Sequence, residues 1–399
     1  MGSILSQKTA RSMFLCGMCI LMTSLAFALG DDRRNYILIA AMGISPLIIV
    51  LTPLITRNDA YIYIIIILSI FCPLLTHPAT MRWSTVLYGC MFYLYLMALC
   101  HLFMFSNISQ SDIMKLLKCL LFAYAIVLII QQLCVLLGLP IFNVSNYNIK
   151  EPWKLNSLMS EPEHSGRMVG LLMYSYLTIK SIKSGDESFV ESWKSEKWLW
   201  CAFIWCVLTS MSAGAYLFFF IVLTKFMTSK NFLQIAFSLS AVFLATNFLF
   251  ESVALERFIK FSSATLTFDI YKMCQADLSA ALRIVPSILC IQQIDLSTID
   301  GWFGHGIDYV STFMSNYIKG VESGYTGGGL FLSAVEYGFL VFIVLVVVTF
   351  KLCYDKNNKI PTILFWVFSV LFVGVNSQIT WATITMLYIV KCSKQTIDI

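Results

Sequence analysis

Long runs of apolar residues recur from one end of the chain to the other, separated by polar connections. Many approach the roughly 20 residues that an α-helix needs to cross a bilayer, and several are shorter. The runs lie near residues 12–29, 36–55, 60–75, 83–105, 113–139, 167–180, 198–209, 213–227, 231–250, 329–350, 360–375 and 378–391. The pattern predicts an all-α, polytopic integral membrane protein with about 12 transmembrane helices. We expect one integral membrane domain over residues 1–399.

The positions of Lys and Arg predict how these helices are oriented. Cytoplasmic connections of membrane proteins are enriched in Lys and Arg, and basic residues recur here in alternate connections. The first run reads as a retained helix, because Gly30-Asp31-Asp32 is a poor signal-peptide cleavage site. Alternation then places both termini in the cytoplasm and two long loops, 140–166 and 251–328, on the outer side.

The composition is typical of an integral membrane protein and limits the kinds of partner that we expect. Hydrophobic residues make up 58% of the chain and charged residues 12%. The net charge of +5 indicates no nucleic-acid partner, because orientation of the helices accounts for the basic residues. Most of the 13 cysteines lie in or beside apolar runs. Cys274 and Cys290 share the second long loop, where an oxidising compartment would allow them to pair.

The densest group of candidate chemical side chains opens the run at 167–180. Glu161, Glu163, His164 and Arg167 lie within two helical turns of one another. Carboxylates and imidazoles can act as acids or bases, and a guanidinium binds phosphate. Because ionisable groups are costly at the edge of a bilayer, we predict a functional site here.

Part of this group also fits a structural role. Ser160 and Glu163 have the spacing of a capping box, and Glu163 and Arg167 have the i,i+4 spacing of a helical ion pair. Neither motif needs Glu161 or His164. These two residues therefore carry the prediction of function most directly.

Other special residues fit structural roles. Gly166 and Gly170 have the small-xxx-small spacing that is typical of close helix packing. His77 and His101 are expected at helix ends, without partners evident from the sequence. We assign no chemistry to these four residues.

A second group of candidates lies in the loop 251–328 and the run that follows it. Arg283 precedes a glycine-rich sequence with His305 and Asp308, and Glu336 lies inside the next apolar run. Glycine turns beside Arg and His can bring donors to a diphosphate, and a carboxylate inside a span must pair or act. Around Arg283, apolar residues at helical spacing predict an amphipathic helix lying at the membrane surface: Leu278, Ala281, Leu282, Val285 and Leu289.

The order of these motifs resembles the O-antigen polymerase (Wzy) family, within the polymerase and ligase group of bacterial surface polysaccharides. The resemblance rests on Ser-Glu-Pro at 160–162, Ala-Leu-Arg at 281–283, Trp-Phe-Gly-His-Gly at 302–306, and the sequence from Phe331 to Gly338. The matching motifs fall within residues 155–345. The rest of the chain resembles the family only in its pattern of hydropathy.

The resemblance implies a GT-C-like glycosyltransferase of the bacterial inner membrane, with both long loops in the periplasm. It would join oligosaccharide repeat units carried on undecaprenyl diphosphate. Glu161 or His164 would supply the base, and Arg167 and Arg283 would bind the diphosphate. The other candidates would support them: Glu163, His305, Asp308 and Glu336. We expect no catalytic metal and no cofactor. The partners that the resemblance implies are the lipid-linked glycans, membrane lipids, a chain-length regulator and a flippase.

The chain departs from the family pattern at two places, and these bear on which function we expect. Ligases of this group resemble one another in a His-x-Asn that would fall near residues 326–328, where this chain lacks the His. Family members often carry Arg in a Ser-Arg-Gly run, whereas Ser212-Ala213-Gly214 stands here. An O-antigen ligase and a lipid-linked oligosaccharide flippase are the alternatives. Ionisable groups gathered in loops and at helix ends favour an enzyme over a transporter.

Overall fold

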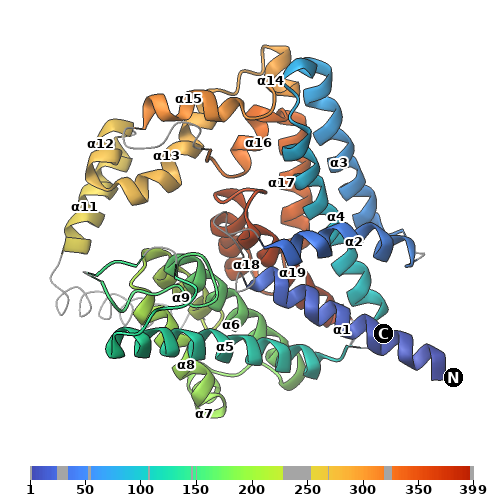
Figure 1. Cartoon of the computed structure of the whole chain (residues 1–399), viewed down its shortest axis with the longest axis vertical. Coiled ribbons are helices and arrows are strands. Elements are labelled where there is room, and N and C mark those ends of the chain that lie inside the picture. Colours follow the sequence, from blue (N-terminus) through green and yellow to red (C-terminus); the bar gives the residue numbers. More distant parts are fainter. Residues whose placement is uncertain are drawn as a thin grey trace.

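Every regular element that the structure describes is a helix, so the predicted all-α class is confirmed for these residues. The structure, a computed structural model, describes residues 2–24, 35–52, 55–106, 108–144, 147–149, 151–227, 253–267, 269–318 and 326–395. The run predicted at 231–250 lies outside the described residues. Figure 1 shows helices α11 to α15 arching away from helices α5 to α9, with α18 and α19 between these groups.

The first half of the chain supplies long apolar helices and one short 3-10 turn. They are α1 (Gly2–Thr23), α2 (Tyr36–Val50), α3 (Arg57–Thr76), η1 (Pro78–Thr80), α4 (Trp83–Phe105) and α5 (Gln110–Leu137). Thr56 and Ser109 begin α3 and α5 with capping boxes, in which Asp59 and Asp112 accept from the cap backbone. Gly138, with φ 65°, ends α5 in the left-handed conformation that glycine adopts without strain.

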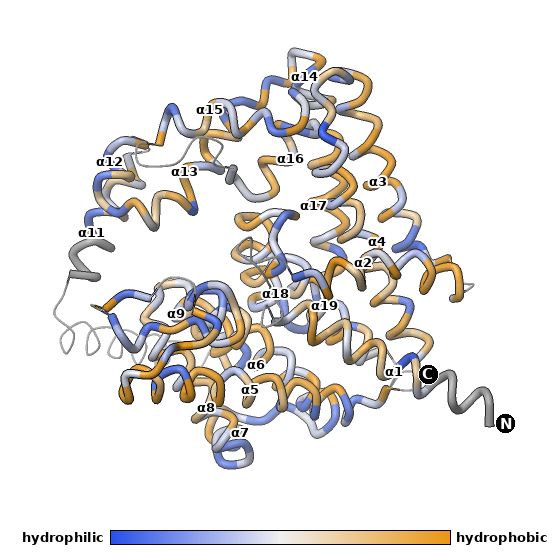
Figure 2. Tube along the Cα trace, in the orientation of Figure 1, coloured by the Kyte–Doolittle hydropathy of each residue, from blue (hydrophilic) through white to orange (hydrophobic). Residues whose placement is uncertain are grey.

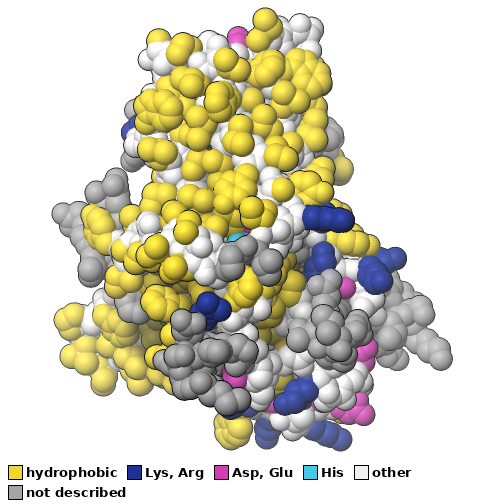
Figure 3. All heavy atoms as spheres, turned by 90° about the vertical axis from the view of Figure 1, so that its right-hand side faces the viewer, with side chains coloured by type: hydrophobic (Ala, Val, Ile, Leu, Met, Phe, Trp, Pro, Cys, Tyr) yellow, Lys and Arg dark blue, Asp and Glu magenta, His cyan; other side chains and the backbone are white. Residues whose placement is uncertain are grey.

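Among the described residues, three helices are long and apolar enough to cross a membrane: α3, α4 and α5. Shorter apolar helices include α1, α2, α8, α9 and α17, so the figure of about twelve spans stays a prediction. Apolar residues run along most helices in Figure 2. In Figure 3 they cover the upper part of the visible face, whereas Lys and Arg gather on its lower part.

Helix α6 lies at the centre of the main core. The helices of this part are α6 (Pro162–Ser184), α7 (Phe189–Ser195), α8 (Lys197–Ser210) and α9 (Ala213–Thr224). Of the 23 residues of α6, those from Met168 to Ile179 are all buried, against α5, α8, α9 and α19. A Cβ atom at Gly166 or Gly170 would overlap Ala215 or Phe218 of α9. Close packing at these two glycines is therefore confirmed.

The segment 251–328, predicted as a long loop, contains a helical unit with its own apolar core. Its helices are α11 (Val253–Leu266), α12 (Ile270–Ala276), α13 (Leu278–Gln292), α14 (Ile299–Phe303) and α15 (Tyr309–Tyr317). The predicted helix around Arg283 is confirmed as α13. Its buried residues Ala281, Val285 and Leu289 pack in a core shared with α12, α15 and α16. This part of the face therefore packs on protein, and the position of α13 at the membrane surface stays a prediction.

The last helices are interrupted where the sequence predicted continuous spans. They are α16 (Leu330–Glu336), α17 (Phe339–Cys353), α18 (Lys359–Trp366), the π-helix η2 (Val367–Leu371) and α19 (Gln378–Gln395). Between α16 and α17, Gly338 has φ 98°, and a Cβ there would overlap the Trp302 carbonyl of α14. The break thus lets the loop unit pack closely against the α16–α17 junction.

Candidate functional site

The carboxylate of Glu163 lies between two guanidinium groups from distant parts of the chain. Its Oε1 accepts a hydrogen bond from Arg167 Nη2, and its Oε2 accepts one from Arg283 Nη2. Glu163 and Arg167 belong to the start of α6, whereas Arg283 belongs to α13, 120 residues further along. The side chain of Glu163 is 8% exposed and that of Arg283 is 42% exposed. The ion pair between Glu163 and Arg283 joins the helical unit of the long loop to the main core. We call Glu163 and its two arginines, Arg167 and Arg283, the arginine pair site.

The start of α6 differs from the predicted capping box. Glu161, not Ser160, is the N-cap residue, and its side chain makes no capping hydrogen bond. Pro162 occupies the first helical position, where its missing N–H costs nothing. The Glu163 carboxylate instead accepts hydrogen bonds from its two arginines, because hydrogen bonds between charged groups are roughly twice as strong as neutral ones. The capping-box prediction was wrong, and the predicted Glu163–Arg167 ion pair is confirmed.

Helix α9 approaches the Glu163 carboxylate through a glycine. A Cβ at Gly214 would lie 2.5 Å from Glu163 Oε1, which is too close for any real contact. Gly214 comes from the Ser212-Ala213-Gly214 sequence, and Ala213 beside it is exposed. The backbone of α9 therefore forms one wall of the site.

Arg167 is held by contacts on three sides. Besides Glu163, its Nη1 donates to the Phe368 carbonyl at 3.3 Å, and its guanidinium lies over the Phe218 ring at 5.7 Å from the centroid. Phe368 belongs to the π-helix η2, a helix form that often occurs at functional sites. Among the described residues, the buried Nε of Arg167 has no hydrogen-bond partner. Arg167 is therefore held in place by its neighbours, and its buried Nε is a donor without a partner among the described residues.

His164 and Glu161 lie beside the arginine pair site. His164 Nδ1 is 3.0 Å from Ser160 Oγ, and the imidazole is largely buried. Burial lowers the pKa of His164, the nearby charge of Glu161 raises it, and the charge of Arg167 lowers it. The net direction is downward, so the imidazole is neutral at pH 7. Glu161 itself is exposed. The structure thus brings together five of the predicted residues: Glu161, Glu163, His164, Arg167 and Arg283.

The other three predicted residues form a separate group in which each has a local partner. Asp308 accepts a hydrogen bond from Arg82 Nη1 at 2.7 Å. Glu336, 3% exposed, accepts from the Val310 backbone N–H at 3.3 Å. The His305 ring stacks on Tyr309, with 4.6 Å between centroids. These contacts connect α15 with α16, with the residues between α14 and α15, and with the residue that precedes α4.

The glycine turns of this second group serve close packing. Gly304 has φ 93°, and a Cβ there would overlap the Glu336 carbonyl. Gly329 has φ 65°, and a Cβ there would overlap the Leu371 carbonyl. Both turns therefore face protein backbone, which leaves less room for the diphosphate contact that their sequence suggested.

Two histidines expected to lack partners have them. His77 Nε2 is 3.2 Å from Asp300 Oδ1 in α14. His101 Nε2 is 3.0 Å from Asp59 Oδ2, and its Nδ1 is 2.6 Å from Thr52 Oγ1. The prediction that they lack partners was wrong, because each partner is far away in the sequence. Cys274 and Cys290 are both free thiols here.

Sequence reasoning missed two contributors to the site. Phe218 and Phe368 contact Arg167 from α9 and η2. Both stand among other aromatic and aliphatic residues, and the Phe368 contact is made by a backbone carbonyl that no side chain reveals.

Neither a scan against protein-family models nor a search of curated proteins finds a match to this chain.

Proposed function

We propose that this chain is an O-antigen polymerase, a glycosyltransferase that joins undecaprenyl-diphosphate-linked oligosaccharide repeat units. It would act at the periplasmic face of the bacterial inner membrane, in lipopolysaccharide biosynthesis. The observation that carries the proposal is the arginine pair site, where Arg167 and Arg283 converge on the carboxylate of Glu163. Two guanidiniums held around one anionic group are suited to a second anionic group, the diphosphate of the lipid carrier.

The reaction needs a base for the acceptor and cations for the leaving group. The acceptor hydroxyl oxygen attacks C1 of the donor sugar, and the bond from C1 to the diphosphate oxygen breaks. The diphosphate leaves with the electron pair of that bond, and the hydroxyl proton passes to the base. Arg167 and Arg283 stabilise the charge that develops on the diphosphate. Glu163 holds the two guanidiniums in position.

His164 and Glu161 remain the two candidates for the base. Burial favours the neutral form of His164, which can accept a proton at pH 7. A Ser160 hydroxyl that accepts from Nδ1 would leave Nε2 as the accepting atom. Glu161 is exposed at the first turn of α6 and would reach a substrate at the surface. His305, Asp308 and Glu336 support the reaction indirectly, by fixing the helical unit that carries Arg283.

One observation favours a flippase as the second candidate. Asp59 and His101 form a hydrogen-bonded pair between the candidate spans α3 and α4, with side chains 3% and 2% exposed. Ionisable groups buried inside spans are typical of transport pathways. The pair is fully enclosed and hydrogen-bonded, however, and it also fits a structural role. An O-antigen ligase is the further alternative within the enzyme class.

Deletion of the gene from its own host separates these functions. A polymerase mutant would still flip and ligate single repeat units, leaving lipopolysaccharide capped with one unit. A ligase mutant would build polymer that stays on the lipid carrier, and a flippase mutant would trap lipid-linked units on the cytoplasmic face of the membrane. Gel-resolved lipopolysaccharide is expected to show the single-unit cap. Unsubstituted core would overturn the proposal.

A further inference from the structure

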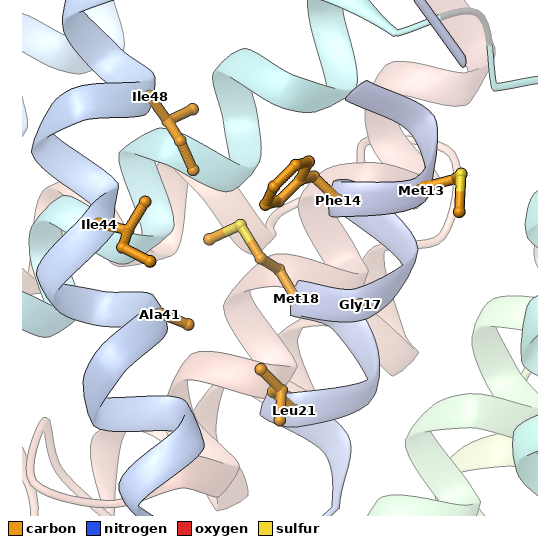
Figure 4. A pocket seen from close by; sticks show the side chains of 8 residues that line it. All are labelled: Met13, Phe14, Gly17, Met18, Leu21, Ala41, Ile44 and Ile48. Atoms are coloured by element: carbon orange, nitrogen blue, oxygen red, sulfur yellow. The ribbon is translucent and has the colours of Figure 1, made fainter. Parts of the chain in front are cut away.

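An apolar groove of about 360 Å³ lies between α1 and α2, away from the arginine pair site. Figure 4 shows Phe14 and Met18 of α1 opposite Ile44 and Ile48 of α2. Every residue that lines the groove is apolar or glycine. Because the lining offers no side-chain hydrogen bond, the groove suits a hydrocarbon chain rather than a sugar or a polar peptide.

The groove exists because a small residue stands between large ones. Gly17 lies on α1 between Phe14 and Leu21, and a Cβ there would meet no atom within 4 Å. Ala41 provides a second small residue on α2. A larger side chain at Gly17 would extend from this open position into the groove.

The rim of the groove continues into an apolar outer surface. Met13 and Phe14 are 71% and 59% exposed, and Leu47 and Val50 of α2 are 59% and 78% exposed. Exposed apolar residues then continue along the candidate span α3. A surface of this kind is in contact with lipid chains when the protein is in a membrane.

A positive charge stands at one end of the groove. Arg11 lies two residues before Met13, where the lining of the groove begins, and on the stripe of α1 that continues as Phe14, Met18 and Leu21. Its guanidinium lies 5.9 Å from the centroid of the Phe105 ring of α4. A cation at the end of an apolar groove complements a lipid whose headgroup is anionic.

We propose that the α1–α2 groove binds one acyl chain of an anionic membrane phospholipid, with its phosphate headgroup beside Arg11. An acyl chain gains little by leaving other chains for an apolar groove, because both surroundings are apolar. Selectivity therefore comes from the headgroup charge. One cationic side chain near an anionic surface corresponds to a preference of about fivefold for anionic over zwitterionic lipid. This lipid is distinct from the substrate of the arginine pair site.

Three substitutions test the groove in the full-length protein. Gly17→Leu fills it, and Arg11→Gln removes the charge at its end. Gly43→Leu is the matched control, because Gly43 is an exposed glycine of α2 outside the groove whose added Cβ would also meet nothing within 4 Å. Thermal melting in detergent is expected to be the same for Gly17→Leu and Gly43→Leu, which shows that a change in lipid binding does not come from misfolding.

The probes are dioleoyl phosphatidylglycerol and dioleoyl phosphatidylcholine, added to delipidated protein in detergent and counted per protein by native mass spectrometry. The wild type and Gly43→Leu are expected to bind one phosphatidylglycerol more than Gly17→Leu does. Arg11→Gln is expected to bind both lipids equally. Equal lipid binding by the wild type and Gly17→Leu would overturn the proposal. A wild-type dimer that Gly17→Leu converts to a monomer would also overturn it, because a second copy would then occupy the groove.

Discussion

Glu163 of α6 and Arg283 of α13 form an ion pair between two parts of the chain with separate apolar cores. Glu163 also holds Arg167, so one carboxylate fixes a guanidinium from each part. The position of Arg283 therefore depends on the packing of the helical unit α11–α15 against the rest of the molecule. Substitutions at this junction test whether the site binds a diphosphate.

We predict that Arg283→Lys loses most polymerising activity at normal protein level. Lys keeps the charge but cannot make the forked contacts of a guanidinium. Loss of one hydrogen bond to a charged group, about 1.5–3 kcal/mol, corresponds to about a ten- to hundredfold fall in rate. The measurement is the lipopolysaccharide ladder of a deletion strain that expresses each variant. If Arg283→Lys gives the wild-type lipopolysaccharide ladder and Arg283→Ala does not, Arg283 acts only as a point charge.

Glu163→Gln is predicted to destabilise the protein. The substitution leaves the buried guanidinium of Arg167 without its counter-ion, and breaking a buried pair costs about 3–5 kcal/mol. Because Arg283 is partly exposed, we expect the lower end of this range. Thermal melting of the purified variant measures it. Glu191→Gln, at an exposed helix start in α7, is the control and is expected to melt near the wild type. Equal melting of both variants would show that Glu163 is not needed to hold the arginines.

His164→Ala is predicted to abolish most activity and to remove the acidic limb of the pH profile. Burial lowers the pKa of His164, so its neutral, proton-accepting form persists below the ordinary value of about 6.5. Activity of the wild type should therefore be kept as the pH falls to about 6.5 and lost only below it. Glu161→Gln provides the comparison. If this variant loses activity while His164→Ala keeps it, Glu161 is the base.

Gly214→Ala is predicted to impair activity by displacing the Glu163 carboxylate, because the added methyl group would lie 2.5 Å from Oε1. Gly43→Ala is the matched control, since its methyl group meets nothing within 4 Å. The lipopolysaccharide ladder reports activity, and immunoblotting reports the protein level. Wild-type activity of Gly214→Ala would mean that the observed position of Glu163 is not required.

The topology also gives a direct test. Alkaline phosphatase fused after Asn148 or Ser315 is predicted to be active, and fused after Lys194 or Asp355 inactive, because the Lys and Arg pattern places the first two outside the cytoplasm. An active fusion at Lys194 with an inactive one at Asn148 would place the arginine pair site on the cytoplasmic side.

Local spacing predicted the parts of the site that lie within one helix. The i,i+4 pair of Glu163 and Arg167 and the helix around Arg283 follow from periodicity, which is a property of short segments. The capping box failed because its Glu163 has stronger, charged partners in the fold.

Contacts between distant segments could not be predicted in this way. Arg283 meets Glu163 only after the helices of the long loop pack together, and the carbonyl of Phe368 comes from η2, 201 residues beyond Arg167. Likewise, the apolar face of α13 has the same pattern whether it packs on lipid or on protein. A single sequence does not distinguish these surroundings.

Polymerisation by the purified protein tests directly whether Arg167 and Arg283 act on a lipid-linked diphosphate. The wild type is incubated with undecaprenyl-diphosphate-linked repeat units, and the products are separated by size. We expect glycans of two or more units together with released undecaprenyl diphosphate, and loss of both products in Arg167→Ala and Arg283→Ala. Products that are undiminished in both variants, or a folded wild-type protein that leaves the lipid-linked units unjoined, would contradict the proposed function.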